Sequence, residues 1–192
     1  MRKLFFYAML FMAASLSAQD LVNFKLQPDG TFKAEDGKSF VVIEYDGKNQ
    51  QELYNMVKAN VLTLYDNPQE VLNEIEPTNI TIRGISDVLW SGIKLIGGIQ
   101  EYRAKYNYVF HFKDGRIKVD APLIDSQLVV SGMGVTFSKT FVSFIDDWFD
   151  KKGGIKKKKE KDVSSVESIF NIPINYLLGN MKENIKEEEE DW

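Results

Sequence analysis

The sequence predicts an α+β domain in which a four- or five-stranded antiparallel sheet packs against two principal helices. Three observations lead to this fold class. Residues 102–121 alternate strictly between polar and apolar side chains around an Asp114-Gly115 turn, residues 53–64 are apolar at helical spacing, and the overall order is strand, helix, several strands, helix. The chain has 192 residues and is 44% hydrophobic, which is enough for one domain with its own core.

The first 18 residues have the features of a cleavable secretory signal. Arg2 and Lys3 precede an apolar run over residues 4–16, and small residues follow up to Ala18. The run is shorter than the roughly 20 residues of a spanning helix, so a retained anchor is the less favoured alternative. Cleavage after Ala18 leaves 174 residues and changes the formal charge from −4 to −6, because the segment contains two cations and no acid. We therefore expect an exported protein, periplasmic or associated with the cell envelope.

The mature chain is expected to begin with a polar leader over residues 19–37, which contains one short strand near residues 31–33. The α+β domain follows over residues 38–130. Residues 39–45 form a nearly continuous apolar run, which is typical of a central strand. Asn49 and Glu52 have the spacing of a capping box, and the helix that they begin is expected to end near Asp66.

The next elements are shorter. Pro68 stands at the first position of a second helix that is expected to end near Asn73. Ile80 and Ile82 alternate with polar residues up to Gly84, which indicates a half-buried strand. Residues 85–99 are expected to form a strand and a turn, and residues 123–130 a further strand.

The Asp114-Gly115 turn sets the register of the clearest hairpin. Every apolar residue then meets an apolar partner, which supports the register. The expected pairs are Lys113–Arg116, Phe112–Ile117, His111–Lys118, Phe110–Val119 and Tyr108–Ala121.

Residues 131–182 are expected to form a helical extension. The spacing of Phe137, Phe141, Phe144 and Trp148 indicates a helix, which either packs on the sheet, our preferred interpretation, or lies on a membrane. A lysine-rich loop over residues 151–161 has a local charge of +6, from seven lysines and one glutamate. One kinked helix or two shorter ones follow over residues 163–181, because Pro173 interrupts the pattern. Residues 183–192 form an acidic tail, which could pair with the loop.

Part of the chain resembles a known family. Lys38-Ser39-Phe40-Val41-Val42-Ile43-Glu44-Tyr45, Gln51-Glu52-Leu53-Tyr54-Asn55-Met56-Val57 and Phe112-Lys113-Asp114-Gly115-Arg116-Ile117-Lys118-Val119-Asp120-Ala121-Pro122 are similar to the uncharacterised, secreted Bacteroides-type domain with a TATA-binding-protein-like (TBP-like) fold. The resemblance covers about residues 36–125. It implies a single copy of an antiparallel sheet curved around helices, and it transfers no functional residue.

The composition excludes several chemistries. The chain has no cysteine, so it has no disulfide, thiol nucleophile or thiolate metal site. The single histidine, His111, lies on the polar face opposite Lys118, and the register places no serine or aspartate beside it. We therefore predict no catalytic, cofactor-binding or metal-ligating residue. Nucleic acid is not an expected ligand. An exported chain of charge −6 has neither the location nor the excess of basic residues that a DNA-binding domain is expected to have.

One surface merits a functional hypothesis. The polar face of the hairpin carries cations that could hold an anionic ligand, although charged residues are also the default on a solvated sheet face. These are Arg103, Lys105, His111, Lys113, Arg116 and Lys118. The sequence thus favours a non-catalytic binding or interaction protein of the bacterial envelope, with an unknown envelope ligand or protein partner and peripheral membrane contact as a possibility. The alternative is a carboxylate-dependent hydrolase of the periplasm, which requires a pocket where two acids converge.

Overall fold

A long central strand organises the fold. The computed structural model describes residues 22–94, 98–131, 134–137, 141 and 145–179. Strand β7 (Gly98–Lys113) has antiparallel neighbours along both edges. One edge pairs with β5 (Asn79–Ile85) and β6 (Trp90–Lys94), and the other with β8 (Arg116–Asp120) and β9 (Leu123–Ser131).

Three further strands complete a sheet of eight. They are β3 (Phe40–Glu44) beyond β8, β4 (Leu72–Ile75) beyond β5, and β10 (Gly134–Phe137) beyond β9. A separate small sheet contains β1 (Lys25–Leu26) and β2 (Phe32–Lys33). The α+β class is confirmed, with an antiparallel sheet and two principal helices, and the sheet has more strands than the expected four or five.

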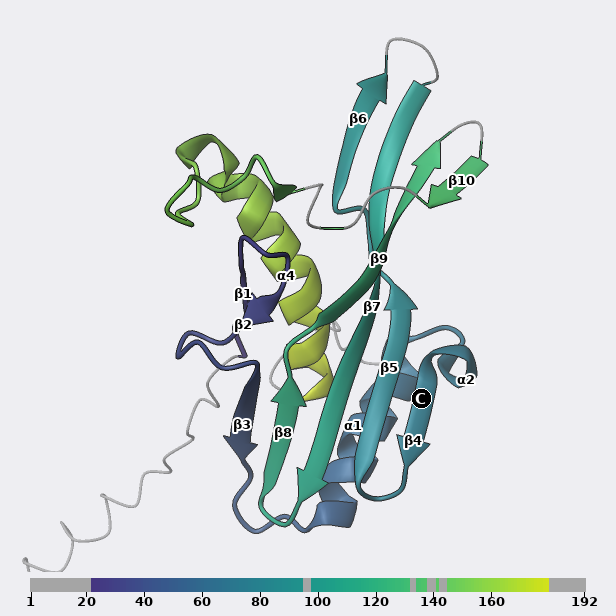
Figure 1. The fold of residues 1–192 in the computed structure, drawn as a ribbon. Helices are drawn as coiled ribbons and strands as arrows, with labels where there is room; N and C mark the ends of the chain where they lie inside the picture. Colours follow the sequence, from purple (N-terminus) through teal and green to yellow (C-terminus); the bar gives the residue numbers. More distant parts are fainter. Residues whose placement is uncertain (1–21, 95–97, 132–133, 138–140, 142–144, 180–192) are drawn as a thin grey trace, which may run out of the picture.

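The helices cover one face of the sheet. Helix α1 (Gln50–Leu64) packs against β5, β7 and β8 and against helix α4 (Glu160–Leu177), and it lies behind the lower half of the sheet (Figure 1). The core between the layers contains Tyr54, Phe110 and Phe170, each 0% exposed. No helix in the described part of the chain is long and apolar enough to cross a membrane.

The hairpin register is confirmed for four of the five expected pairs, from Lys113↔Arg116 to Phe110↔Val119. The fifth pair, Tyr108–Ala121, is wrong. The β8 ladder with β7 ends before it, and after Pro122 the chain enters β9, where Leu123 pairs with Asn107. Proline has no N–H for a ladder, so it marks the change from β8 to β9 along the same edge of β7.

The expected capping box begins α1. The Asn49 side-chain oxygen accepts the Glu52 N–H at 2.9 Å, and the Glu52 carboxylate accepts the Asn49 N–H at 2.7 Å. The short helix α2 (Pro68–Val71) is also present. It ends two residues before Asn73, because residues 72–75 form β4 and pair with β5. The sequence had not indicated this strand.

Strand β3 is an edge strand and not the expected central one, since β8 is its only neighbour in the described chain. Its apolar run covers two different environments. Ile43 faces the core and is 9% exposed, whereas Val42 faces outward and is 46% exposed. Apolar residues on both faces therefore did not mean pairing on both edges.

The helix expected from Phe137 to Trp148 is wrong as a single element, because Phe137 belongs to β10. Phe141, Ile145 and Trp148 are 5%, 0% and 2% exposed, so these side chains pack in the core. Phe144 lies outside the described residues. The packing of these side chains agrees with docking inside the protein and not with a membrane-facing stripe.

The lysine-rich segment is partly helical. Residues 157–159 form a 3₁₀ turn and α4 begins at Glu160, so the loop is shorter than expected. Helix α4 is one helix that contains Pro173. The expected signal peptide and acidic tail lie outside the described residues.

Candidate binding surfaces

The outer face of the sheet is open. Tyr106, Tyr108, Phe110 and Phe112 point to the helices and are buried, so the alternate residues of β7 point outward. No described helix covers this outer face (Figure 1). All six residues of the predicted anionic-ligand surface project from it, and we name this surface the open face.

Two like-charged pairs stand opposite each other at the hairpin end of the open face. His111 faces Lys118, and Lys113 faces Arg116. Asp120 lies diagonally across from His111 and contacts both members of the first pair, at 2.9 Å from His111 Nε2 and 2.8 Å from Lys118 Nζ. The expectation that no acid lies beside His111 is therefore wrong, because it considered directly opposed residues and not the diagonal ones.

Lys113 and Arg116 share no acid in this way, although Glu44 of β3 stands directly opposite Arg116. Both side chains are exposed, and the described residues offer neither of them an ion pair. The intervening Asp114 accepts the backbone N–H of Gln50 at 2.8 Å, so this carboxylate is used to hold the start of α1. Like charges directly opposite each other destabilise a sheet. This pair is therefore a positive site at the end of the hairpin, with the Glu44 carboxylate on the β3 side of Arg116 and no acid beside Lys113.

The other two predicted residues lie apart from this cluster. Lys105 and His111 are six residues apart on β7, which is about 20 Å along a strand. Arg103 contacts the Glu101 carboxylate at 3.0 Å, and Lys105 also has an interaction of its own. The structure thus brings together His111, Lys113, Arg116 and Lys118 and separates Arg103 and Lys105 from them.

The sequence analysis missed other parts of the open face. Arg83 of β5 pairs with Asn107 and is exposed beside the predicted residues. Three large apolar side chains are also exposed there: Val42 at 46%, Ile85 at 55% and Leu123 at 58%. The alternation of β5 was a signal that could have placed Arg83 on this face, whereas the exposure of Val42 depends on which strands pair.

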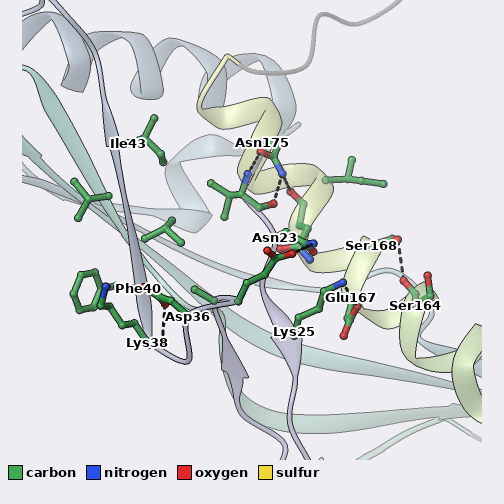
Figure 2. Close-up of a pocket in the computed structure, with 17 residues that line it drawn as sticks. Asn23, Lys25, Asp36, Lys38, Phe40, Ile43, Ser164, Glu167, Ser168 and Asn175 are labelled. Carbon is green, nitrogen blue, oxygen red and sulfur yellow. Dashed lines mark hydrogen bonds and ion pairs between the residues drawn. The ribbon is translucent and has the colours of Figure 1, made fainter. Parts of the chain in front are cut away.

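A groove runs between the outer edge of β3 and helix α4 (Figure 2). It encloses about 990 Å³, and the turn at residues 34–38 and the segment 22–25 close its sides. Glu167 of α4 lines it, and both its oxygens are occupied, one by the Leu26 N–H at 3.0 Å and one by Lys25 Nζ at 3.1 Å. Asp36 at the rim binds Lys38, whose ammonium and backbone N–H lower the pKa of that carboxyl.

Two asparagines of α4 hold the N-terminal segment by its backbone. The Asn171 side chain accepts the Phe24 N–H at 2.8 Å and donates to the Phe24 carbonyl at 2.9 Å. Asn175 makes the same two contacts with Val22, both at 2.8 Å. One turn of helix separates the two residues, so their amides satisfy alternate residues of the extended segment as a neighbouring strand would.

Comparison with known proteins finds likeness at the level of structure. No family model matches the chain, and no curated protein matches it. Among solved structures, a TBP-like protein from Parabacteroides distasonis is similar at a TM-score of 0.45 and 13% identity, over 73% of this chain and 86% of that one. A DUF4468 family protein from Bacteroides ovatus is similar at a TM-score of 0.44 and 13% identity, over 85% of this chain and 92% of that one. The first of these neighbours carries the TBP-like description that the sequence resemblance named, and at this identity the likeness concerns the fold alone.

Proposed function

We propose that the protein is an exported, non-catalytic binding protein of the bacterial envelope, which holds an anionic ligand at the hairpin end of its open face. The observation that carries this proposal is the opposed pair Lys113 and Arg116, which is exposed and forms no ion pair with the described residues; its one neighbouring carboxylate, Glu44 of β3, stands opposite Arg116 and leaves Lys113 without an acid beside it. Repulsion between two opposed cations lowers the stability of the fold. An anionic group bound between them removes this repulsion.

Neighbouring groups support an anionic ligand. Lys118 lies next to Arg116 along the same outward row of β8, and its one carboxylate contact is shared with His111. A ligand with several negative charges can therefore contact three cations at once. The exposed Val42 on the adjacent strand adds an apolar surface beside the charges.

A non-catalytic role is supported by the use of the acids in the groove. A hydrolase needs two carboxyl groups that converge on a substrate. Glu167 uses both oxygens to hold residues 25–26, and Glu35 accepts from the Asn23 amide at 3.2 Å. These carboxylates stabilise the N-terminal segment, which is a structural task.

The envelope location is proposed from the N-terminal sequence, where a basic start, an apolar run and a small-residue end precede Gln19. The absence of cysteine agrees with this location, since the buried core needs no disulfide in an oxidising compartment.

The test is binding of the mature chain to vesicles of phosphatidylglycerol and phosphatidylcholine in equal parts, compared with pure phosphatidylcholine. We expect the double variant Lys113→Glu/Arg116→Glu to lower the affinity for the anionic vesicles by about tenfold or more, because each surface cation contributes about 1 kcal/mol at such a membrane. Dextran sulfate in a parallel assay distinguishes an acidic glycan from a lipid headgroup as the source of the anion.

The matched control is Lys151→Glu/Lys152→Glu, which changes the net charge equally at two exposed lysines outside the open face. This control should bind almost as the unaltered chain does. Equal losses of affinity for the anionic vesicles in both variants would mean that the overall charge, and not the hairpin end, governs binding. No loss in the hairpin variant, or binding that is insensitive to salt, would reject the proposal.

A further inference from the structure

Helix α4 ends in a turn that directs the chain away from the helix axis. Gly179 has a φ of +75°, in the left-handed region that favours glycine, and its N–H donates to the Tyr176 carbonyl at 2.9 Å. The Leu178 carbonyl accepts from the Tyr45 hydroxyl at 2.9 Å. Tyr45 directly follows β3, so α4 ends beside the end of this strand.

The groove between β3 and α4 starts at this point. Its lining on the helix extends from Asn175, near the end of α4, back to Ser164, near the start (Figure 2). An exposed apolar side chain lines the groove from each wall, Ile172 at 52% on the helix and Val42 at 46% on the strand. The groove is therefore a channel that leads from the end of α4 back toward its start.

The lysine-rich segment, residues 151–161, lies at the other end of the same helix. It contains seven lysines and one glutamate, and α4 begins within it at Glu160. Among the described residues only Lys159 of these seven forms an ion pair, with Asp162 at 3.3 Å. The flanking Asp150 carboxylate accepts two backbone N–H groups of its own turn, at 2.7 and 3.0 Å. The other lysines of the segment are exposed, and in the described part of the chain no carboxylate lies within ion-pair distance of them.

We propose that residues 180–192 fold back along this groove, antiparallel to α4, and that their acidic run Glu187–Asp191 pairs with the lysine-rich segment. The lengths agree. Eight extended residues from Gly179 to Glu187 span about 26–29 Å, and the 18 residues of α4 span about 27 Å. The acidic run therefore begins level with the start of the helix, where the lysines lie.

The charges match along the whole path. Residues 180–186, which would lie in the groove, carry two lysines and one glutamate, a net charge of +1. The charged residues that line the groove have a net charge of −1; they are Lys25, Lys38, Glu35, Asp36 and Glu167. The acidic run has a charge of −5 and the lysine-rich segment a charge of +6. An acidic run placed inside the groove would instead meet the three carboxylates there.

The hairpin end of the open face is the competing destination for the acidic run. It is near the end of α4, because the Tyr45 N–H donates to the Gly115 carbonyl at 2.7 Å. Its exposed cations, Lys113 and Arg116, lie on the face of the sheet away from the helices, and Glu44 already stands opposite Arg116. The lysine-rich segment offers more cations without an ion pair, and the groove leads to it. This inference uses neither the open face nor the ligand proposed for it.

The first test is zero-length cross-linking of the mature chain at about 1 μM with a carbodiimide, which joins a lysine amine to a carboxylate in contact with it. We expect the links within single molecules to join residues 187–191 to lysines of residues 151–161. Their yield should fall about tenfold or more in 1 M salt, where the Debye length is about 3 Å. Lys113 and Lys118 are the built-in controls, since both are available to the same carboxylates if the acidic run lies at the hairpin end.

The second test uses the lack of native cysteine. Lys186 is seven extended residues beyond Gly179, or about 23–25 Å, and Ser164 is fifteen helical residues before it, or about 22 Å. In the proposed path the two side chains are level, so the pair Ser164→Cys/Lys186→Cys should form a disulfide under mild oxidation.

The matched control is Leu62→Cys/Lys186→Cys. Leu62 is 57% exposed on α1 and lies outside the groove. It is also close to the start of residues 180–192, because the Asn60 amide of the same helix donates to the Leu177 carbonyl at 3.0 Å. We expect the Ser164 pair to oxidise at least about tenfold faster, since docking raises the effective concentration of the second thiol.

The third test exchanges the charges in the Ser164→Cys/Lys186→Cys chain. Lys157→Glu/Lys158→Glu should slow disulfide formation about tenfold, and the further change Glu188→Lys/Glu189→Lys should restore the rate, because opposite charges then face each other again. Lys113→Glu/Arg116→Glu is the control and should leave the rate unchanged. All these positions of the described chain are exposed, so each variant should keep the thermal transition of its parent.

Four results would overturn the proposal. They are the absence of carbodiimide links between the two segments within one molecule, links of the acidic run mainly to Lys113 or Lys118, equal oxidation rates for the Ser164 and Leu62 pairs, and a charge exchange that does not restore the rate. None of these results depends on whether the open face binds an anionic vesicle.

Discussion

Replacing Asn171 by alanine removes the amide that holds the N-terminal segment at Phe24. In the native chain this one side chain satisfies both backbone groups of Phe24, and Asn171 and Phe24 are 8% and 0% exposed. Alanine leaves a buried N–H and a buried carbonyl without partners on the helix.

The expected loss follows from those two groups. Each buried unsatisfied group costs about 1–3 kcal/mol, and the better helix propensity of alanine returns up to about 0.7 kcal/mol. For the two groups together we therefore expect the free energy of unfolding to fall by about 1–6 kcal/mol, and each kcal/mol lowers Tm by roughly 2–4 °C for a chain of this size. Detachment of the segment is not an easier response. It would expose Phe24 and Leu26, whose burial contributes about 1.5–3 kcal/mol each.

The assay is urea unfolding followed by circular dichroism, together with hydrogen exchange at the Phe24 amide. Ser168→Ala is the matched control, because Ser168 is exposed on the same helix and, among the described residues, its hydroxyl bonds only to the Ser164 carbonyl within α4. We expect this control to stay within about 0.5 kcal/mol of the unaltered chain. If Asn171→Ala is equally mild and the Phe24 amide remains protected, then the amide contacts do not hold the segment.

Three further predictions concern the core and α1. Burial raises the pKa of Tyr65, Tyr106 and Tyr108 above the usual 10.0, so the folded state holds these protons more tightly and its stability should fall as pH rises above about 10. Tyrosinate absorbance should therefore appear together with unfolding. Titration of these phenols while the chain is still folded would contradict this prediction. Gly84→Ala places a Cβ 2.7 Å from the Tyr106 hydroxyl oxygen and 2.8 Å from its ring, so we expect a loss of about 1–3 kcal/mol in urea unfolding, and an unchanged midpoint would refute the clash. Glu52→Ala removes half of the capping box and should cost about 0.5–1 kcal/mol by the same measurement, whereas Glu52→Gln, which keeps an acceptor, should cost less.

The elements that the sequence predicted are those whose pattern is local. The β7–β8 register follows from a two-residue turn and from alternation on both sides of it, and all the information lies between Phe110 and Val119. Helix α1 likewise begins at a capping box and continues at a helical period, so its start and buried face needed no distant contact.

The elements that the sequence missed depend on contacts distant in the chain. Residues 72–75 have no strong strand preference and become β4 because β5 offers a free edge beside them. The apolar run of β3 gave no indication that, in the part of the chain that the structure describes, β8 would be its only neighbour. Asn171 and Asn175 resemble a solvated helix face in the sequence, and their role appears only when residues 22–24 lie against α4.

The open face has its origin in the lengths of the elements and in the side of the sheet on which the helices lie. Strand β7 has 16 residues and is about 53 Å long, whereas α1 has 15 residues and is about 22 Å long and α4 has 18 residues and is about 27 Å long. The described helices therefore cover one face of part of the sheet and leave the opposite face to solvent.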